Sequence, residues 1–272
     1  MRNNKLIFII LVTFLCNACN DVNKKKESTS ITNTSSASAT EAALKVALDK
    51  SPDSTLLIQN LVEYYAVAQN YDAALATVDK ALKRDIANPY LWDMKSIVAG
   101  QKGDTAQAIS AMEKAIQILP NPEFVISLGA LYAETGNQKA LELADALLVG
   151  SKAKAEKEAH FIKGLYYSFK NEKETAIPFF NKCMALDYTF VQAYLEKALA
   201  LFDLKKYVAA ADVLEKAVTV QNQFERGYYY LGQCYEKLNR TQEAIEVYQR
   251  ALIIDPKYVE VKDALGKLGV SN

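Results

Sequence analysis

The chain has 272 residues, and its charge is balanced, with 32 lysines and arginines against 32 aspartates and glutamates. This balance excludes the strongly basic surface that is typical of nucleic-acid-binding proteins, so no nucleic-acid partner is expected. Only 10 glycines and 6 prolines occur, which favours a helical chain. The length alone would allow two globular domains.

Residues 1–18 are predicted to be a secretion signal. Arg2 and Lys5 provide a basic start, and an apolar run extends from Leu6 to Cys16. A bilayer is spanned by roughly 20 apolar residues, so this run is too short for a transmembrane helix. Its length suits the core of a signal peptide.

A second cysteine follows this signal. Small Ala18 precedes Cys19, and Leu15 lies just upstream. This arrangement resembles the cleavage box of bacterial lipoproteins, although Cys16 stands where that box usually has leucine. The resemblance implies lipidation of Cys19 and firm attachment to a membrane, because several acyl chains hold a protein better than one. The alternative is an ordinary signal peptide that is cleaved near this cysteine.

Residues 19–40 are predicted to be a flexible tether. Three lysines (24–26) precede a run rich in serine and threonine (28–40). Few of these side chains are apolar, so little burial is available to offset the entropy that ordering would cost. A coil of about 20 residues has an average reach of about 25 Å. The lysines are interpreted as solvated, with contact to anionic lipid headgroups as the alternative.

Residues 225–258 carry a complete repeat signature. Apolar residues at helical spacing flank residues 238–241, which predicts two helices joined by a tight turn. Pro256 is predicted to end the second helix, because proline restricts the residue before it and donates no helical hydrogen bond. The signature residues are Tyr228, Leu231, Gly232, Tyr235, Ala244, Tyr248, Ala251 and Pro256. Their spacing is that of the 34-residue tetratricopeptide pattern, so the chain resembles this family of protein-binding scaffolds.

The same unit recurs along the chain. Counting back from Ala244 in steps of 34 residues reaches Ala210, Ala176, Glu142, Ala108 and Ala74. In the exceptional unit the alanine falls at Ala140, after a shorter turn, and a longer connection at residues 150–154 restores the length. Six full repeats are predicted, at residues 55–88, 89–121, 122–156, 157–190, 191–224 and 225–258.

Partial helices are predicted to cap both ends. Residues 41–50 have the spacing of a second helix, and residues 264–266 repeat the Leu-Gly step of the signature. One helix pair cannot bury its apolar faces alone, whereas stacked pairs can. Residues 41–272 are therefore predicted to form an all-α fold, a right-handed superhelical α-solenoid of about six repeats with partial capping helices.

Small residues are predicted where the two helices of a pair cross. At Gly232 and Ala244 a side chain longer than a methyl group would hold the backbones apart, and large residues such as Tyr248 fill the surrounding space. The corresponding small residues of the two preceding repeats are Gly164, Ala176, Ala198 and Ala210.

Residues with catalytic or ligand-binding chemistry are sparse. The single histidine, His160, stands at an aromatic position of a repeat and is predicted to be a packing residue. A metal site needs several converging ligands, and no spacing here provides them. Cys183 and Cys234 lie in different repeats and are predicted to be buried free thiols. Since no phosphate loop or nucleophile motif occurs, no catalytic residue, metal or cofactor is expected.

The family resemblance implies a concave groove that is lined by the first helices of the repeats and holds a peptide segment or a helix of a partner protein. The N-terminal half of this groove is polar, with Gln59, Asn60, Glu63, Tyr90, Asp93 and Ile97. The candidate binding residues of the C-terminal half are Phe161, Leu165, Leu195, Leu199, Phe202, Tyr229, Tyr230 and Gln233.

Leu195, Leu199 and Phe202 form an apolar stripe at helical spacing. An exposed stripe of this kind marks a protein interface. Two alternatives remain open: these side chains pack between neighbouring first helices, or residues 268–272 fold back over them. A clamp for a chaperone's C-terminal carboxylate is not expected, because Tyr90 and Met94 stand where such a clamp needs polar or basic groups.

The order of signal, tether and repeats resembles that of bacterial outer-membrane tetratricopeptide lipoproteins, which are adaptors for cell-wall hydrolases or assembly factors. We therefore expect a scaffold that is lipid-anchored in the bacterial cell envelope, at the outer membrane. One alternative is an assembly subunit of a secretion, pilus or outer-membrane machine, which would co-purify stoichiometrically with its partners. The other is an envelope enzyme or small-ligand protein, which would need a deep closed pocket.

Overall fold

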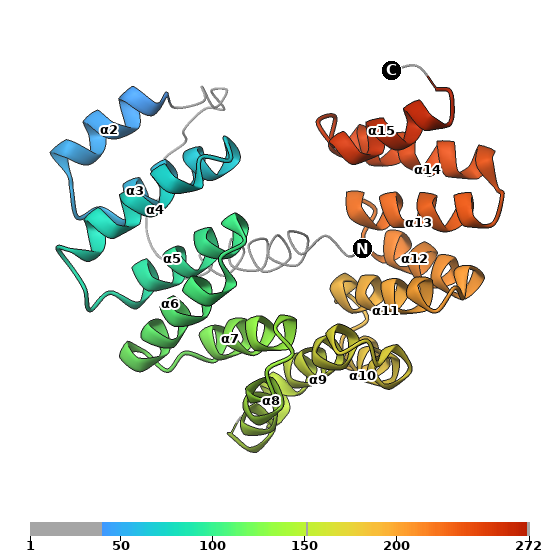
Figure 1. Ribbon diagram of the computed structural model, residues 1–272, viewed down its shortest axis with the longest axis horizontal. Helices are drawn as coiled ribbons and strands as arrows, with labels where there is room; N and C mark the ends of the chain where they lie inside the picture. The colour runs from blue at the N-terminus through green and yellow to red at the C-terminus, as the bar shows by residue number, and fades with distance from the viewer. Residues whose placement is uncertain (1–39, 151, 271–272) are drawn as a thin grey trace, which may run out of the picture. The chain divides into compact units, whose positions relative to one another are not determined.

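The structure, a computed structural model, describes residues 40–150 and 152–270 (Figure 1). These two ranges contain fourteen α-helices and no strand. The predicted signal, Cys19 and residues 19–39 of the predicted tether lie outside them. The helices are α2 (Glu41–Lys50), α3 (Thr55–Val67), α4 (Tyr71–Leu82), α5 (Pro89–Lys102), α6 (Thr105–Ile118), α7 (Pro122–Glu134), α8 (Lys139–Gly150), α9 (Lys152–Phe169), α10 (Lys173–Leu186), α11 (Val191–Asp203), α12 (Tyr207–Val220), α13 (Glu225–Lys237), α14 (Thr241–Ile254) and α15 (Val259–Lys267).

The helices form six successive pairs, from α3 and α4 to α13 and α14, with α2 and α15 as single helices at the two ends. The predicted solenoid of about six helix pairs with partial capping helices is therefore confirmed. Within the described residues, no helix is long and apolar enough to cross a membrane. The chain divides into two compact units, one ending at Leu131 and the other beginning at Tyr132, and each is described by itself.

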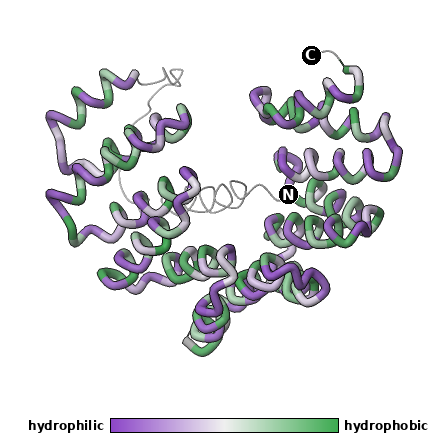
Figure 2. The backbone as a smooth tube through the Cα atoms, in the orientation of Figure 1, coloured by the Kyte–Doolittle hydropathy of each residue, from purple (hydrophilic) through white to green (hydrophobic). Residues whose placement is uncertain are grey.

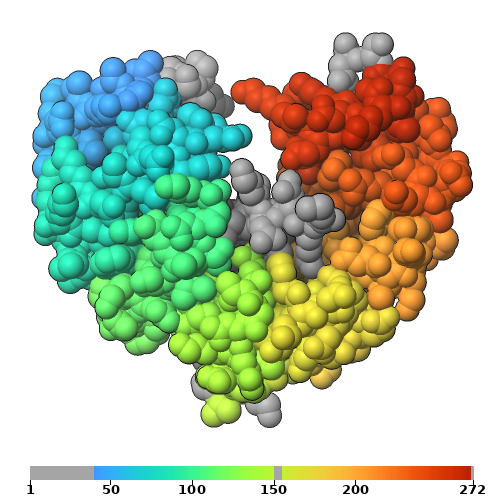
Figure 3. Space-filling view, viewed as in Figure 1, coloured from blue at the N-terminus to red at the C-terminus, as the bar shows by residue number. Residues whose placement is uncertain are grey.

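Each unit is built by stacking consecutive pairs. Within the second unit, α9 packs on α10, α10 on α11 and α12 on α13, while α11 also contacts both α9 and α13. In the first unit α4 contacts α5, and α3 contacts α5. Figure 2 shows hydrophobic and hydrophilic residues interspersed along the helices, and Figure 3 shows consecutive parts of the chain, which have neighbouring colours, lying side by side within each unit. First helices therefore neighbour first helices.

The turn within each pair has one recurring geometry. One residue adopts a positive φ angle, and the next donates its backbone N–H to a carbonyl five residues earlier. In the last pair Asn239 has the positive φ, and Arg240 donates its N–H to the Tyr235 carbonyl at 2.9 Å. This bond closes the C-terminus of the first helix in the manner of a Schellman motif. The residues with positive φ are Gln69, Gly103, Gly136, Asn171, Lys205 and Asn239.

Asp104 shows how one turn also starts the next helix. Its side chain accepts a hydrogen bond from the backbone N–H of Gln107 at 3.0 Å, which satisfies one of the unpaired donors at the start of α6. Asn70 caps α4 in the same way, through the backbone N–H of Ala73 (3.2 Å).

In two pairs a glycine of the first helix makes room for an aromatic side chain of the second. A Cβ atom on Gly232 would lie 2.4 Å from the Tyr248 ring, and one on Gly164 would lie 2.5 Å from the Phe180 ring. The residues that the sequence analysis placed at the helix crossings are all buried. Glycine is thus required here by the ring of the partner helix.

Other repeats have side chains of different size at the same two positions, which are sixteen residues apart. Ala198 stands opposite Leu214, and Ser96 stands opposite Met112 in the sequence period. Ser96 is fully buried and donates its hydroxyl to the backbone carbonyl of Ala108 at 2.8 Å. As the first-helix residue grows, the second-helix residue shrinks, which keeps the volume between the helices filled.

The structure departs from the sequence analysis at residues 150–154. A longer connection was predicted there, but α8 runs to Gly150 and α9 begins at Lys152, which makes α9 18 residues long. Lysine, alanine and glutamate are good helix formers, so extending the helix here has a lower free energy than forming a loop. Ala155 and Ala159 are buried, so the additional turn contributes to the core.

Two glycine substitutions test this packing account. Gly232→Ala should lower the free energy of unfolding by about 1–3 kcal/mol, because the new methyl group meets the Tyr248 ring. Gly266→Ala is the matched control: this glycine follows the same Leu-Gly step in α15, and its Cβ would meet no atom within 4 Å. It should stabilise the protein by about 0.5–1 kcal/mol. Urea denaturation measures both, and effects of equal sign would contradict the account.

Candidate functional site

Three of the eight predicted groove residues in the second unit are buried. Leu195 is 0%, Leu165 1% and Phe161 8% exposed. The Phe161 ring lies 5.0 Å from that of Phe190 and 6.0 Å from that of Phe180, measured between centroids. These three side chains are apolar and buried within the helix stack, so for them the structure corrects the groove assignment in favour of packing between helices.

The other five predicted groove residues are half-buried and form what we name the aromatic patch: Leu199, Phe202, Tyr229, Tyr230 and Gln233. The first two lie on α11 and the other three on α13. These helices contact each other. The patch therefore extends across two neighbouring first helices within one compact unit.

Tyr229 is the centre of the aromatic patch. Its ring centroid lies 5.0 Å from Tyr230, 5.3 Å from Tyr258 and 6.1 Å from Tyr248. Gln233 donates its side-chain amide to the Tyr229 phenol oxygen at 2.8 Å. Aromatic side chains held in this way present a large contact area with little further loss of conformational entropy on binding.

The Tyr229 phenol stays protonated at neutral pH. Burial raises its pKa, and the nearby carboxylates of Glu260, Glu236 and Asp263 act in the same direction. Its proton is therefore available for a hydrogen bond to a partner. Helix α15 ends with the same closure as the turns within the pairs, with a positive φ at Gly269 and the backbone N–H of Val270 bonded to the Leu265 carbonyl at 3.0 Å. The predicted fold-back includes residues 271–272, which lie outside the described residues.

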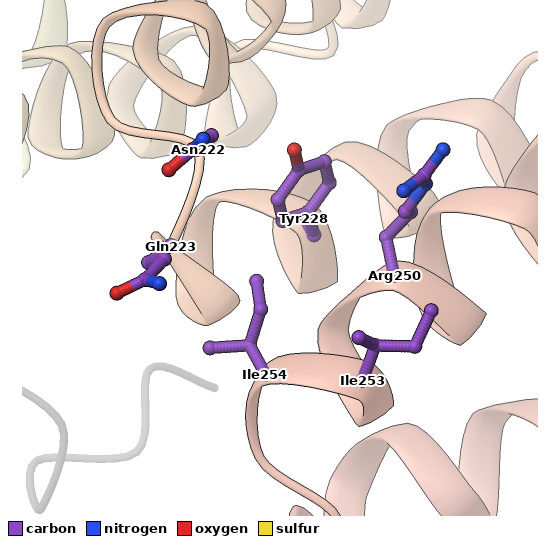
Figure 4. A pocket seen from close by; sticks show the side chains of 6 residues that line it. All are labelled: Asn222, Gln223, Tyr228, Arg250, Ile253 and Ile254. Atoms are coloured by element: carbon purple, nitrogen blue, oxygen red, sulfur yellow. The ribbon is translucent and has the colours of Figure 1, made fainter.

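A cavity of about 400 Å³ lies at the ends of α13 and α14, at a place that the sequence analysis did not identify. Figure 4 shows Tyr228 between the loop residues on one side and Arg250 on the other. Its lining residues are Asn222, Gln223, Tyr228, Arg250, Ile253 and Ile254. Four of these six are exposed. The cavity is an open depression and differs from the enclosed pockets that bury a small ligand.

The first unit contains a buried carboxylate with one oxygen that has no hydrogen-bond partner among the described residues. Asp93 on α5 is 8% exposed, and its Oδ1 atom accepts no hydrogen bond. Burial raises the pKa of this carboxyl to about 7, and repulsion by Glu123 on α7 adds to the effect. An unpaired buried charge is costly, so Asp93 destabilises the free protein near neutral pH.

The histidine and the two cysteines of the described residues are buried. His160 is 9% exposed, lies 6.1 Å from the Phe179 ring, and has a pKa lowered chiefly by burial. Cys183 and Cys234 are free and buried, as predicted, and burial raises the pKa of each thiol to about 12. Among the described residues, no group of three or more His, Cys, Asp or Glu side chains could hold a metal ion.

Comparison with known families agrees with this architecture. Models described as "Tetratricopeptide repeat" match residues 89–122, 157–190, 191–224 and 225–258, which together make up half of the chain. The chain belongs to the tetratricopeptide repeat family. Tetratricopeptide repeats serve as scaffolds for protein–protein interaction, so the residues of interest are those that could receive a partner.

Relatives and solved structures share the repeat architecture. The chain is 24% identical over 254 residues to the TPR repeat-containing protein MJ1428 of Methanocaldococcus jannaschii, covering 85% of the chain but only 44% of that relative. It therefore spans less than half of the relative's length. A tetratricopeptide repeat protein from Parabacteroides merdae is 19% identical, with a TM-score of 0.65 over 84% of this chain and 91% of that one.

A third similar structure is that of PilW, described as a type IV pilus biogenesis factor. It is 18% identical and has a TM-score of 0.55 over 77% of this chain and 97% of that one. Likeness at this level of identity shows a shared tetratricopeptide fold.

Asp93 has a residue type that is unusual for its position in the repeat. It stands at the tetratricopeptide position that is held by Phe161, Leu195 and Tyr229 in three later repeats. Those side chains are apolar or aromatic, whereas Asp93 places a carboxylate in the equivalent enclosed place. The sequence contained this signal, but only the structure shows that no cation from the described part of the chain accompanies the carboxylate.

The cost of Asp93 should be measurable as a pH-dependent stability. Its pKa is higher in the folded chain than in the unfolded chain, so the wild-type protein loses stability as the pH rises from about 4 through about 7. Asp93→Asn removes this loss. At pH 8 the variant should be more stable than wild type by about 2–4 kcal/mol, and this advantage should disappear near pH 4.

Urea denaturation of both proteins at the two pH values measures this difference. Asp212→Asn, which alters an exposed carboxylate on α12, is the matched control and should show no such pH-dependent gain. A wild-type protein that is more stable than Asp93→Asn at pH 8 would mean that Asp93 has a stabilising partner.

Proposed function

We propose that this chain is a membrane-anchored envelope lipoprotein that recruits other proteins through its tetratricopeptide repeats, with the aromatic patch as the docking surface. The observation that carries the proposal is the patch itself, which brings half-buried apolar and aromatic side chains from α11 and α13 together. Tyrosine and phenylalanine are enriched at the centres of protein interfaces, where a few such residues provide most of the binding energy.

The partner segment would lie across two first helices. Leu199 and Phe202 offer apolar contact on α11, while Tyr229 and Gln233 on α13 add hydrogen-bonding groups that fix the register of a bound peptide or helix. The Phe202 ring lies 5.0 Å from Tyr207 of α12, which restrains its orientation. The surface thus combines apolar area with a few oriented polar atoms.

Export and anchoring are proposed from the N-terminal sequence. The apolar run, the small residue before Cys19 and the polar tether suit a lipid-anchored protein of the bacterial envelope, at the outer membrane. A second candidate is a subunit of a secretion, pilus or outer-membrane assembly machine. The similarity in fold to PilW supports this second candidate. Stable stoichiometric co-purification would support the subunit, and exchange among several partners would support the scaffold.

Crosslinking and affinity capture from intact cells test the docking surface. The variant Leu199→Glu, Phe202→Ala, Tyr229→Ala should lose the partners that the wild-type protein captures, because it removes apolar area and adds a charge to the patch. A Val208→Ala, Ile253→Ala variant, which alters exposed apolar residues on second helices, should keep them. Circular dichroism confirms folding of each variant. Retention of all partners by the triple variant would refute this location.

Fractionation of cells tests the anchor. Cys19→Ser should move the protein from the membrane fraction to the soluble fraction, since the lipidated side chain is lost. Cys16→Ser is the matched control, because Cys16 lies within the predicted signal and should leave the mature anchor intact. Membrane association that survives Cys19→Ser would point to another means of attachment.

A further inference from the structure

Among the residues that the structure describes, no cation pairs with Asp93. The two lysines of α5 turn to the preceding helix α4: Lys95 pairs with Asp79 and Lys102 pairs with Asp72, each at 2.7 Å. Glu63 is the only charged residue of the neighbouring first helix α3, so that helix adds no positive charge. The buried carboxylate is thus left without a counter-ion among the described residues that face it.

A second carboxylate and an exposed ring complete the surroundings of Asp93. Glu123 at the start of α7 is exposed, and its negative charge adds to the rise in the pKa of the Asp93 carboxyl. Tyr90, one turn before Asp93 on α5, is 50% exposed. The Tyr90 ring packs edge-on against the ring of buried Phe124, with centroids 5.9 Å apart, and this contact restrains its orientation.

We propose that Tyr90, Asp93 and Glu123 form a docking site in the first unit for a lysine or arginine side chain on a peptide segment of a partner protein. This inference rests on the proposed scaffold function and adds a second contact surface with its own chemistry. The partner's cation pairs with the Asp93 carboxylate, while Glu123 supplies a further negative charge and the Tyr90 ring a cation–π contact.

The charge and geometry favour a side-chain cation over a metal ion. Two carboxylates and a ring are too few ligands for a protein metal site, and no larger acidic or histidine cluster occurs among the described residues. A single ammonium or guanidinium group needs only one close carboxylate and a supporting ring. Enclosure of Asp93 strengthens such a pair, because screening by solvent is weak there.

Paired peptides test the proposal on the full-length chain. The probes are an array of acetylated, amidated octapeptides, each made once with a single lysine and once with neutral acetyl-lysine at the same place. For peptides that bind, the lysine form should bind at least about tenfold more tightly. Asp93→Asn keeps the side-chain shape, so it should fold and should reduce this preference to about twofold or less.

The aromatic-patch variant Leu199→Glu, Phe202→Ala, Tyr229→Ala is the matched control and should keep the lysine preference. An unchanged preference in Asp93→Asn, or equal binding of the two peptide forms, would overturn the inference. Binding that appears only after Lys24, Lys25 and Lys26 are replaced by serine would assign the site to the chain's own tether and also overturn it. Loss of the preference with continued capture of patch-dependent partners would leave the proposed function intact.

Discussion

The fit between a first-helix residue and the second-helix residue sixteen positions later, as at Gly232 and Tyr248, is the constraint on which the rest of the structure depends. Where Gly232 leaves room for the Tyr248 ring, the two helices approach closely and their remaining faces are free to stack on neighbouring pairs. Burial in a repeat protein comes from such nearest-neighbour contacts. Within each unit, the stacked first helices then provide a surface on which side chains from neighbouring repeats meet.

The sequence period predicts the order, number and approximate ends of the helices because each repeat must place its small and large residues at the same spacing. It misplaces residues 150–154, where helix-forming side chains extend α9 in place of the expected connection. The period records which positions are equivalent. Local helix propensity decides how far each helix continues beyond them.

The candidate sites were less predictable than the fold. Leu195 and Leu199 stand one turn apart on α11, yet only Leu195 is fully buried. A helical pattern gives the face of a side chain, whereas its exposure depends on the neighbouring helices. Likewise, Lys95 lies two residues from Asp93 in sequence but pairs with Asp79 on another helix. The isolation of the carboxylate therefore follows from tertiary structure alone.

The size matching within pairs limits how such a chain can grow by internal duplication. A duplication with both breakpoints between repeats copies a matched pair, such as Gly232 with Tyr248 or Ala198 with Leu214. A recombination event within the turn would join the first helix of one repeat to the second helix of another. Alanine would then face a tyrosine ring, or glycine would leave a void beside leucine. The whole repeat, rather than the single helix, is therefore the unit of inheritance in this chain.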